Sequence, residues 1–142
     1  MTVNQLSVFI ENKSGTLLKV LEVLKEKRIQ LVALTIADTA EYGICRILCS
    51  EPSRAYQVLR EAGVAVSMCE VLAVVTDDVP GGAADAVSLF AREGISIAYL
   101  YSLMMGGKAI MVFRTDNAEK AEEVIRRGGL RCIGEKELES LS

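Results

Sequence analysis

The sequence repeats itself along its length. When the chain is shifted by 66 positions against itself, it aligns without a gap and Gly15 falls on Gly81. A single unit of this length buries only roughly 60% of its unfolded surface and is marginally stable alone. The repeat therefore predicts two copies of one fold that pack together. Further identical pairs at this shift are Leu6 and Leu72, Ile29 and Ile95, Ala55 and Ala121, and Gly63 and Gly129.

The same order of elements is predicted in both copies. Short apolar runs rich in β-branched residues indicate strands, and apolar residues spaced three or four apart indicate amphipathic helices. One helix is expected after the first strand and another after the third, the latter ending at Gly63 or at Gly128 and Gly129. Hairpin connections are predicted at residues 39–41 and 105–107. The predicted strands are 5–10, 29–37, 42–49, 64–68, 71–76, 95–103, 108–115 and 130–133, and residues 135–141 form a helical tail.

Each copy has the order βαββαβ, so the fold class is α+β. With right-handed crossovers, this order gives a ferredoxin-like antiparallel sheet of four strands with both helices on one face. The repeats are expected to span 1–68 and 69–142. In 71–76 and 95–101 both alternating sets of side chains are largely apolar, which predicts that the back face is covered too, by the other repeat or by another chain. We favour a homo-oligomer, a homodimer formed by sheet packing.

Composition excludes several classes of function. The net charge is −3 and no basic stripe is present, which argues against a nucleic-acid partner. No segment has the apolar length of a membrane span or the pattern of a secretory leader, so we expect no membrane partner and a cytoplasmic location. The chain has four cysteines, none in a CxxC pair, and no histidine, so no metal site, no cofactor and no catalytic residue is predicted. The cysteines are expected to be reduced and buried.

The turns between the first strand and the first helix of each copy are the most informative segments. Glycine at Gly15 and Gly81 permits backbone conformations that other residues avoid. The first amides of the following helix have no partner within it and can bind a carboxylate. Asn12 and Asp78 are placed to accept an ammonium group. Together these features predict a site for an amino acid or a similar small zwitterion.

A purely structural interpretation of the turns stays open. Ser14 or Thr16 could satisfy the helix amides as an N-cap. Pro80 could serve only to pre-set the turn.

The repeated unit strongly resembles the ACT domain. The first turn reads Glu-Asn-Lys-Ser-Gly-Thr-Leu at 11–17, and the second reads Asp-Val-Pro-Gly-Gly at 78–82. The likeness runs from about Val3 to Ile133 and implies a free-standing tandem ACT protein. It implies a regulatory, allosteric role in which amino acids bind and a metabolic enzyme or transcription is controlled. It also implies that paired domains join along their second strands into an eight-stranded sheet.

In such a pair the ligand lies between the turn of one domain and the second strand of its neighbour. Serine replaces the frequent proline at Ser14, and Lys13 contrasts with Asp77 and Asp78, so the two sites are not expected to be equivalent. The ligand-binding residues that the resemblance implies are Asn12, Lys13, Ser14, Gly15, Thr16, Ile36, Ala37, Asp38, Asp78, Val79, Pro80, Gly81, Gly82, Ser102, Leu103 and Met104.

Other classes of protein fit less well. Acylphosphatases share the βαββαβ order but need an arginine in this turn, and neither turn contains one. Residues 107–113 faintly resemble an RNA-recognition strand, yet only Phe113 offers a stacking ring. A metal-carrying domain of this topology would need paired cysteines in the first turn. A ligand-free structural dimerisation module remains the main alternative.

Overall fold

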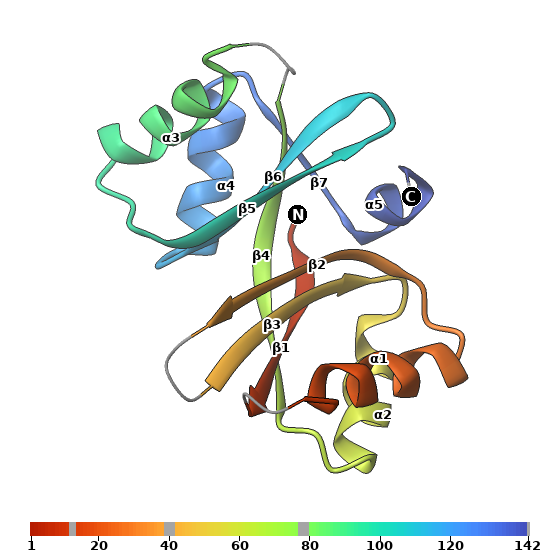
Figure 1. The fold of residues 1–142 in the computed structure, drawn as a ribbon. Coiled ribbons are helices and arrows are strands. Elements are labelled where there is room, and N and C mark those ends of the chain that lie inside the picture. The colour runs from red at the N-terminus through yellow and green to blue at the C-terminus, as the bar shows by residue number, and fades with distance from the viewer. Residues whose placement is uncertain (12–13, 39–41, 77–79, 142) are drawn as a thin grey trace. The chain divides into compact units, whose positions relative to one another are not determined.

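The chain was analysed as a computed structural model, which describes residues 1–11, 14–38, 42–76 and 80–141. Residues 4–69 form one compact unit, called the first unit below, and residues 1–3 with 70–142 form the other, the second unit. The elements are β1 (Val3–Glu11), α1 (Thr16–Glu26), β2 (Leu31–Asp38), β3 (Tyr42–Cys49), α2 (Pro52–Glu61), β4 (Val66–Thr76), α3 (Gly82–Arg92), β5 (Ile97–Met105), β6 (Lys108–Thr115), α4 (Ala118–Arg127), β7 (Arg131–Ile133) and α5 (Glu135–Leu141) (Figure 1).

The strand order confirms two βαββαβ repeats with antiparallel sheets. In the first unit β3 lies between β2 and β1, and in the second unit the order is β5, β6, β4 and β7. Among the described residues the sheet has seven strands rather than the expected eight. The reason is that β4, Val66–Thr76, is one continuous strand where 64–68 and 71–76 were predicted as separate strands. The sequence between them, Cys69-Glu70, contains no glycine or proline that would form a turn.

Each unit has its own core between the helices and one face of the sheet. In the first unit, Leu6 and Val8 of β1 pack against Val20 and Leu24 of α1. In the second unit the rings of Phe90 and Phe113 meet edge to face, with centroids 4.9 Å apart. Figure 1 shows α1 beside α2 and α3 beside α4, each pair on one side of its strands. The predicted placement of both helices on one face is confirmed.

The opposite face of the second unit's sheet is buried as well. Leu72 of β4 pairs with Phe113 of β6, and both belong to the core under the helices. The next pair along these strands is Ala73 and Val112. Successive residues of a strand point to opposite faces. Ala73, Ile110 and Val112 are all fully buried, as predicted for a covered back face, whereas residues 97–101 of β5 are partly buried or exposed, so the prediction is wrong for this strand.

The strands β2 and β5 begin later than predicted for the same physical reason. Strands were expected to begin at 29 and 95, but β2 begins at Leu31 and β5 at Ile97. The amides of Ile29 and Ile95 instead bond to helix carbonyls, at 3.0 Å in both cases. Both side chains are buried, so these apolar residues close the helix ends rather than extend the strands.

The predicted glycine hairpin of the second unit is confirmed. Gly106 and Gly107 connect β5 and β6 with φ angles of 56° and 75°. Positive φ at both central residues matches the right-handed twist of the flanking strands. The corresponding connection of the first unit, residues 39–41, lies outside the described residues.

Candidate functional site

Both glycine turns adopt the same conformation. Gly15 immediately precedes α1 with φ 88° and Gly81 immediately precedes α3 with φ 92°. These left-handed angles are costly for residues that carry a Cβ atom. The agreement between the two units shows that the repeated glycines serve one backbone geometry.

The amides at the start of α1 and α3 are not capped by the residue that precedes each helix. Gly15 and Gly81 have no side chain to accept a hydrogen bond. The hydroxyl of Thr16 donates to the carbonyl oxygen of Glu11 at 2.9 Å, which closes the turn across its base. By contrast, Oδ1 of Asn117 accepts from the amide of Lys120 at 3.1 Å and caps α4. The N-cap residues of α1 and α3 thus leave the positive end of each helix dipole without a side-chain partner of their own.

A groove of about 380 Å³, called the turn groove below, lies beside the first turn. It falls within the range of small-molecule sites. Four segments build it: the end of β1, the start of α1, the start of β3, and the chain leading from α2 into β4. The amide of Phe9 donates to the carbonyl of Ala65 at 3.0 Å and holds two of these segments together. The residues that line it are Phe9, Ile10, Glu11, Thr16, Lys19, Val20, Tyr42, Gly63, Val64 and Ala65.

The turn groove has one charge of each sign and one aromatic wall. Glu11 and Lys19 are both exposed at its rim. Tyr42 of β3 pairs with Glu11 of β1, so the two side chains project from the same face of the sheet. The floor includes Ile10 and Val20, which are buried. Separate parts of the groove thus suit three kinds of chemical group: Lys19 suits a carboxylate, Glu11 suits an ammonium, and the apolar and aromatic lining suits an apolar group.

Only part of the expected site falls in the described structure. Asn12, Lys13, Asp78 and Val79 lie outside the described residues, as does the side chain of Asp38. Thr16 lines the turn groove, and Ser14 and Gly15 stand exposed beside it. In the second unit Pro80 and Gly81 precede α3, and Gly82 is its first residue.

The expected second-strand residues do not line the turn groove. Ile36 and Ala37 are exposed on β2, which pairs with β3 in its unit. Ser102 and Met104 are exposed on β5, and Leu103 between them is partly buried.

Several lining residues were absent from the sequence-based site. Lys19, Phe9 and Tyr42 belong to elements whose pairing register places them together. The register that puts Tyr42 opposite Glu11 is that of β1 with β3, and these strands are separated in the sequence by α1 and β2, so no local turn signal sets it. One signal in the sequence could have pointed to part of this site: alternation along the first strand places the side chains of Phe9 and Glu11 on the same face.

The described residues contain no metal-binding cluster. Among them, no group of three or more His, Cys, Asp or Glu side chains could hold a metal ion. Cys45 is buried, and burial raises the pKa of its thiol to about 11. In the part of the chain that is described, no helix is long and apolar enough to cross a membrane.

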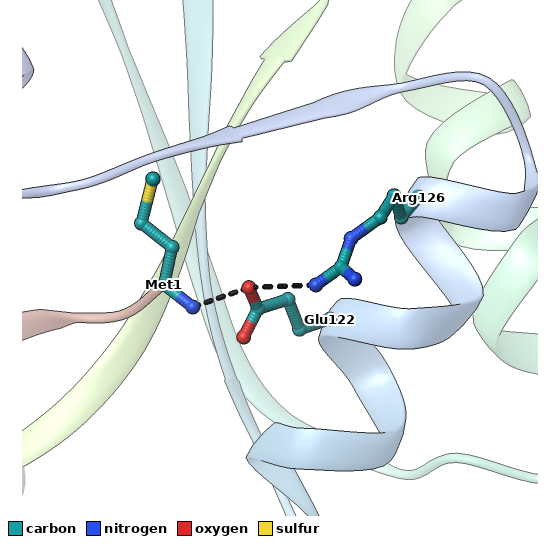
Figure 2. A network of polar contacts seen from close by, with 3 residues as sticks. All are labelled: Met1, Glu122 and Arg126. Atoms are coloured by element: carbon teal, nitrogen blue, oxygen red, sulfur yellow. Dashed lines mark hydrogen bonds and ion pairs between the residues drawn. The ribbon is translucent and has the colours of Figure 1, made fainter.

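One polar network holds the start of the second unit. The Met1 ammonium donates to Oε1 of Glu122 on α4, and Nη2 of Arg126 donates to the same oxygen at 3.1 Å (Figure 2). The bond from the ammonium is the main cause that lowers the pKa of the Glu122 carboxyl. The network is structural and lies outside the turn groove, which belongs to the first unit.

Two ferredoxin-like units in tandem, each with a left-handed glycine turn leading into a helix, define a duplicated regulatory-type fold. A model of the family described as the ACT domain pair matches residues 1–142, and this chain belongs to that family. The resemblance stated from the turns is thereby confirmed. A search of curated proteins found no match.

Solved structures share the whole fold. Protein BT0572 from Bacteroides thetaiotaomicron is 37% identical, with a TM-score of 0.92 over 97% of this chain and 96% of that chain. The ligand-free regulatory subunit of aspartate kinase from Thermus thermophilus is 15% identical, with a TM-score of 0.64 over 88% of this chain and 91% of that chain. The aspartokinase alpha and beta subunits are 15% identical, with a TM-score of 0.60 over 88% and 90%. The last two likenesses concern the fold alone.

Proposed function

We propose that this chain is a non-catalytic regulatory module whose first unit binds an amino acid in the turn groove. One observation carries the proposal: Glu11 and Lys19, of opposite charge, flank a groove at an uncapped helix N-terminus. Lys19 and the helix amides match a carboxylate, Glu11 matches an ammonium, and Tyr42 stands where a ligand side chain would extend. Asn12 and Lys13, which lead into the turn, belong to the same proposed site.

The proposed partners follow from the family. Regulatory subunits of aspartate kinase share this fold, which supports a metabolic enzyme as the regulated target. We propose that each unit corresponds to one of the two sequence repeats. We also propose that the second turn forms a site whose charge differs from that of the first turn. Its residues are Asp78, Val79, Pro80, Gly81 and Gly82. A cytoplasmic location is part of the same proposal.

Calorimetry and thermal-shift measurements against the twenty amino acids test the binding proposal. A ligand at 100 times its dissociation constant stabilises the folded chain by about 2.7 kcal/mol. We expect a stabilising amino acid whose affinity falls at least about tenfold in Glu11→Gln and in Lys19→Gln, since each loses a charged hydrogen-bonding partner. Lys27→Gln, at the exposed C-terminal end of α1, is the matched control and should bind normally.

The results separate the alternatives. If no amino acid shifts the melting temperature, the sensing proposal is rejected. If an amino acid binds and both groove variants keep their affinity, the site is elsewhere in the chain. A bulky residue at Gly15 is a poorer test, because a Cβ atom there meets nothing within 4 Å and would not fill the groove.

A ligand-free dimerisation module is a second candidate function, favoured by apolar residues on the edge strands. Leu34 and Ile36 of β2 are 40% and 48% exposed, and Leu100 and Met104 of β5 are 43% and 58% exposed. Within their units β2 and β5 have one strand neighbour each. We propose that the chain is a homodimer and that these strands, including Ala37, Asp38, Ser102 and Leu103, contribute to its interface. Exposed apolar rows on edge strands favour pairing with another chain.

Light scattering of the purified chain measures the oligomeric state. We expect a dimer that Ile36→Lys or Met104→Lys dissociates, while Lys108→Gln, on the neighbouring strand β6, leaves it intact. A monomeric wild-type chain at micromolar concentration would reject the dimer and, with it, the dimerisation function.

A further inference from the structure

The four long helices that precede a strand all end in the same hydrogen-bonded motif. At the end of α1, the amide of Ile29 bonds to the carbonyl of Leu24 and the amide of Arg28 bonds to that of Lys25, both at 3.0 Å. The ends of α2, α3 and α4 repeat this pair of bonds. This is the Schellman motif, which places one residue in the left-handed conformation just beyond the helix. The residues at that position are Arg28, Gly63, Gly94 and Gly129.

Arg28 is the exception at this position. Its φ is 56°, and in the described residues it is the one non-glycine residue with positive φ. The left-handed conformation costs a residue with a Cβ roughly 1–2 kcal/mol. A cation near a helix C-terminus stabilises the helix by only about 0.3–1 kcal/mol. Lys25 already supplies such a cation in the last turn of α1. Local stability therefore does not account for arginine here, and an observed strain of this kind points to a use of the side chain.

The side chain of Arg28 borders a second groove of the first unit, called the α1–β2 groove below. It has a volume of about 390 Å³ and lies between the end of α1 and the start of β2. Lys25 and Arg28 supply its positive charge, and neither side chain forms an ion pair within the described residues. The remaining lining residues are Leu21, Leu24, Ile29, Gln30 and Leu31, none of them acidic.

The second unit shows that the fold does not require this charge. At the shift of 66 positions, Lys25 corresponds to Ala91 and Arg28 to Gly94. The apolar positions are kept, since Leu24 corresponds to Phe90 and Ile29 to Ile95. The same helix end thus forms with neutral residues at these two positions, and cations at them are specific to the first unit.

We propose that the α1–β2 groove binds a small organic anion, a carboxylate or phosphate carried on a short aliphatic chain. The anionic group lies between Lys25 and Arg28, and Gln30 donates a further hydrogen bond. The chain packs on Leu21 and Leu31 above the buried helix end. The site is separate from the turn groove, so it stands whether or not an amino acid binds there.

The test uses butyrate, hexanoate, hexyl phosphate and inorganic phosphate as probes of the full chain. Titrations are followed by the backbone amide signals of the isotopically labelled protein in nuclear magnetic resonance. We expect hexanoate or hexyl phosphate to shift the signals of residues 21–31 and to bind more tightly than butyrate or inorganic phosphate, because the added methylenes are buried. Binding of only one hexyl compound identifies which anionic group the site takes.

Arg28→Gly distinguishes a binding role from a structural one. Release of the left-handed strain should raise the melting temperature by about 2–4 °C, so the variant folds. Loss of a charged partner should weaken the binding of the hexyl probe at least about tenfold. Arg28→Lys keeps the charge and should retain most of the affinity.

Arg92→Gln, which removes an exposed cation from the last turn of α3, is the control for overall charge and should bind as the wild type does. The proposal is overturned if no probe shifts residues 21–31, or if inorganic phosphate shifts them as strongly as hexyl phosphate does. It is also overturned if Arg28→Gly gains stability and keeps its affinity.

Discussion

The surroundings of Gly15 and Gly81 leave room for a side chain. A Cβ atom at either position meets nothing within 4 Å, so only the φ angles of 88° and 92° restrict the residue type. The cost of replacing them is therefore conformational rather than steric.

We expect Gly15→Ala and Gly81→Ala each to lower the free energy of unfolding by about 1 kcal/mol, as measured by urea denaturation. Gly43→Ala is the control, because Gly43 has no positive φ and its added Cβ meets the Ile36 Cγ2 at an ordinary 3.7 Å. Equal losses in all three variants would show that strain at the turns is not the cause.

A second residue-scale prediction concerns Glu122. The hydrogen bond from the Met1 ammonium lowers the pKa of this carboxyl in the folded chain. A lowered folded-state pKa adds stability above the unfolded-state pKa, about 4.3 for glutamate, and that stability is lost as the pH falls through the folded pKa. Glu122→Gln should therefore cost about 1 kcal/mol at pH 7 and progressively less below pH ~4. A cost that stays constant down to pH 3 would contradict the prediction.

At the scale of elements, α4 has a side-chain cap that α1 and α3 lack. Oδ1 of Asn117 accepts from the amide of Lys120, whereas glycines precede the other two helices. Asn117→Ala should destabilise the chain by about 1 kcal/mol in urea denaturation. Asn117→Asp, which keeps an acceptor, should retain most of the stability; a loss as large as that of alanine would show that the cap is not the source.

The elements were largely predictable because local patterns determine them. Alternation and helical spacing identified the strands and helices, and the glycine pair at Gly106 and Gly107 identified a hairpin. The strand starts at 29 and 95 were wrong because an apolar residue after a helix can close the helix end as readily as begin a strand. Nothing local distinguishes the two uses for Ile29.

The candidate site was less predictable than the elements. Gly15 and Thr16 could be found because the turn has its own sequence pattern. Lys19 and Tyr42 could not, because they meet only through the α1 orientation and the β1–β3 register, which depend on tertiary packing. The unusual backbone of Arg28 was also invisible, since arginine carries no signal for a left-handed conformation.

At the scale of the whole molecule, β4 contributes to the hydrogen-bonded ladders of both units. Its start lies in the first unit, and its end pairs with β6 and β7 in the second. The amides of a strand shared in this way are expected to become exposed in one cooperative opening. In hydrogen exchange, Met68 and Val74 should therefore show similar free energies of opening. A difference of several kcal/mol between the two would indicate that the units unfold independently.

The boundaries of the units have a consequence for engineering. The chain passes from the second unit to the first after Val3 and returns after Cys69, and both passages lie within strands, β1 and β4. In the sequence, the first unit thus lies between two segments of the second unit. The chain passes from one unit to the other within strands and not within loops. A cut after Cys69 would leave part of β4 in each fragment, so transplanting one repeat into another protein requires a donor segment that supplies the missing part of this strand.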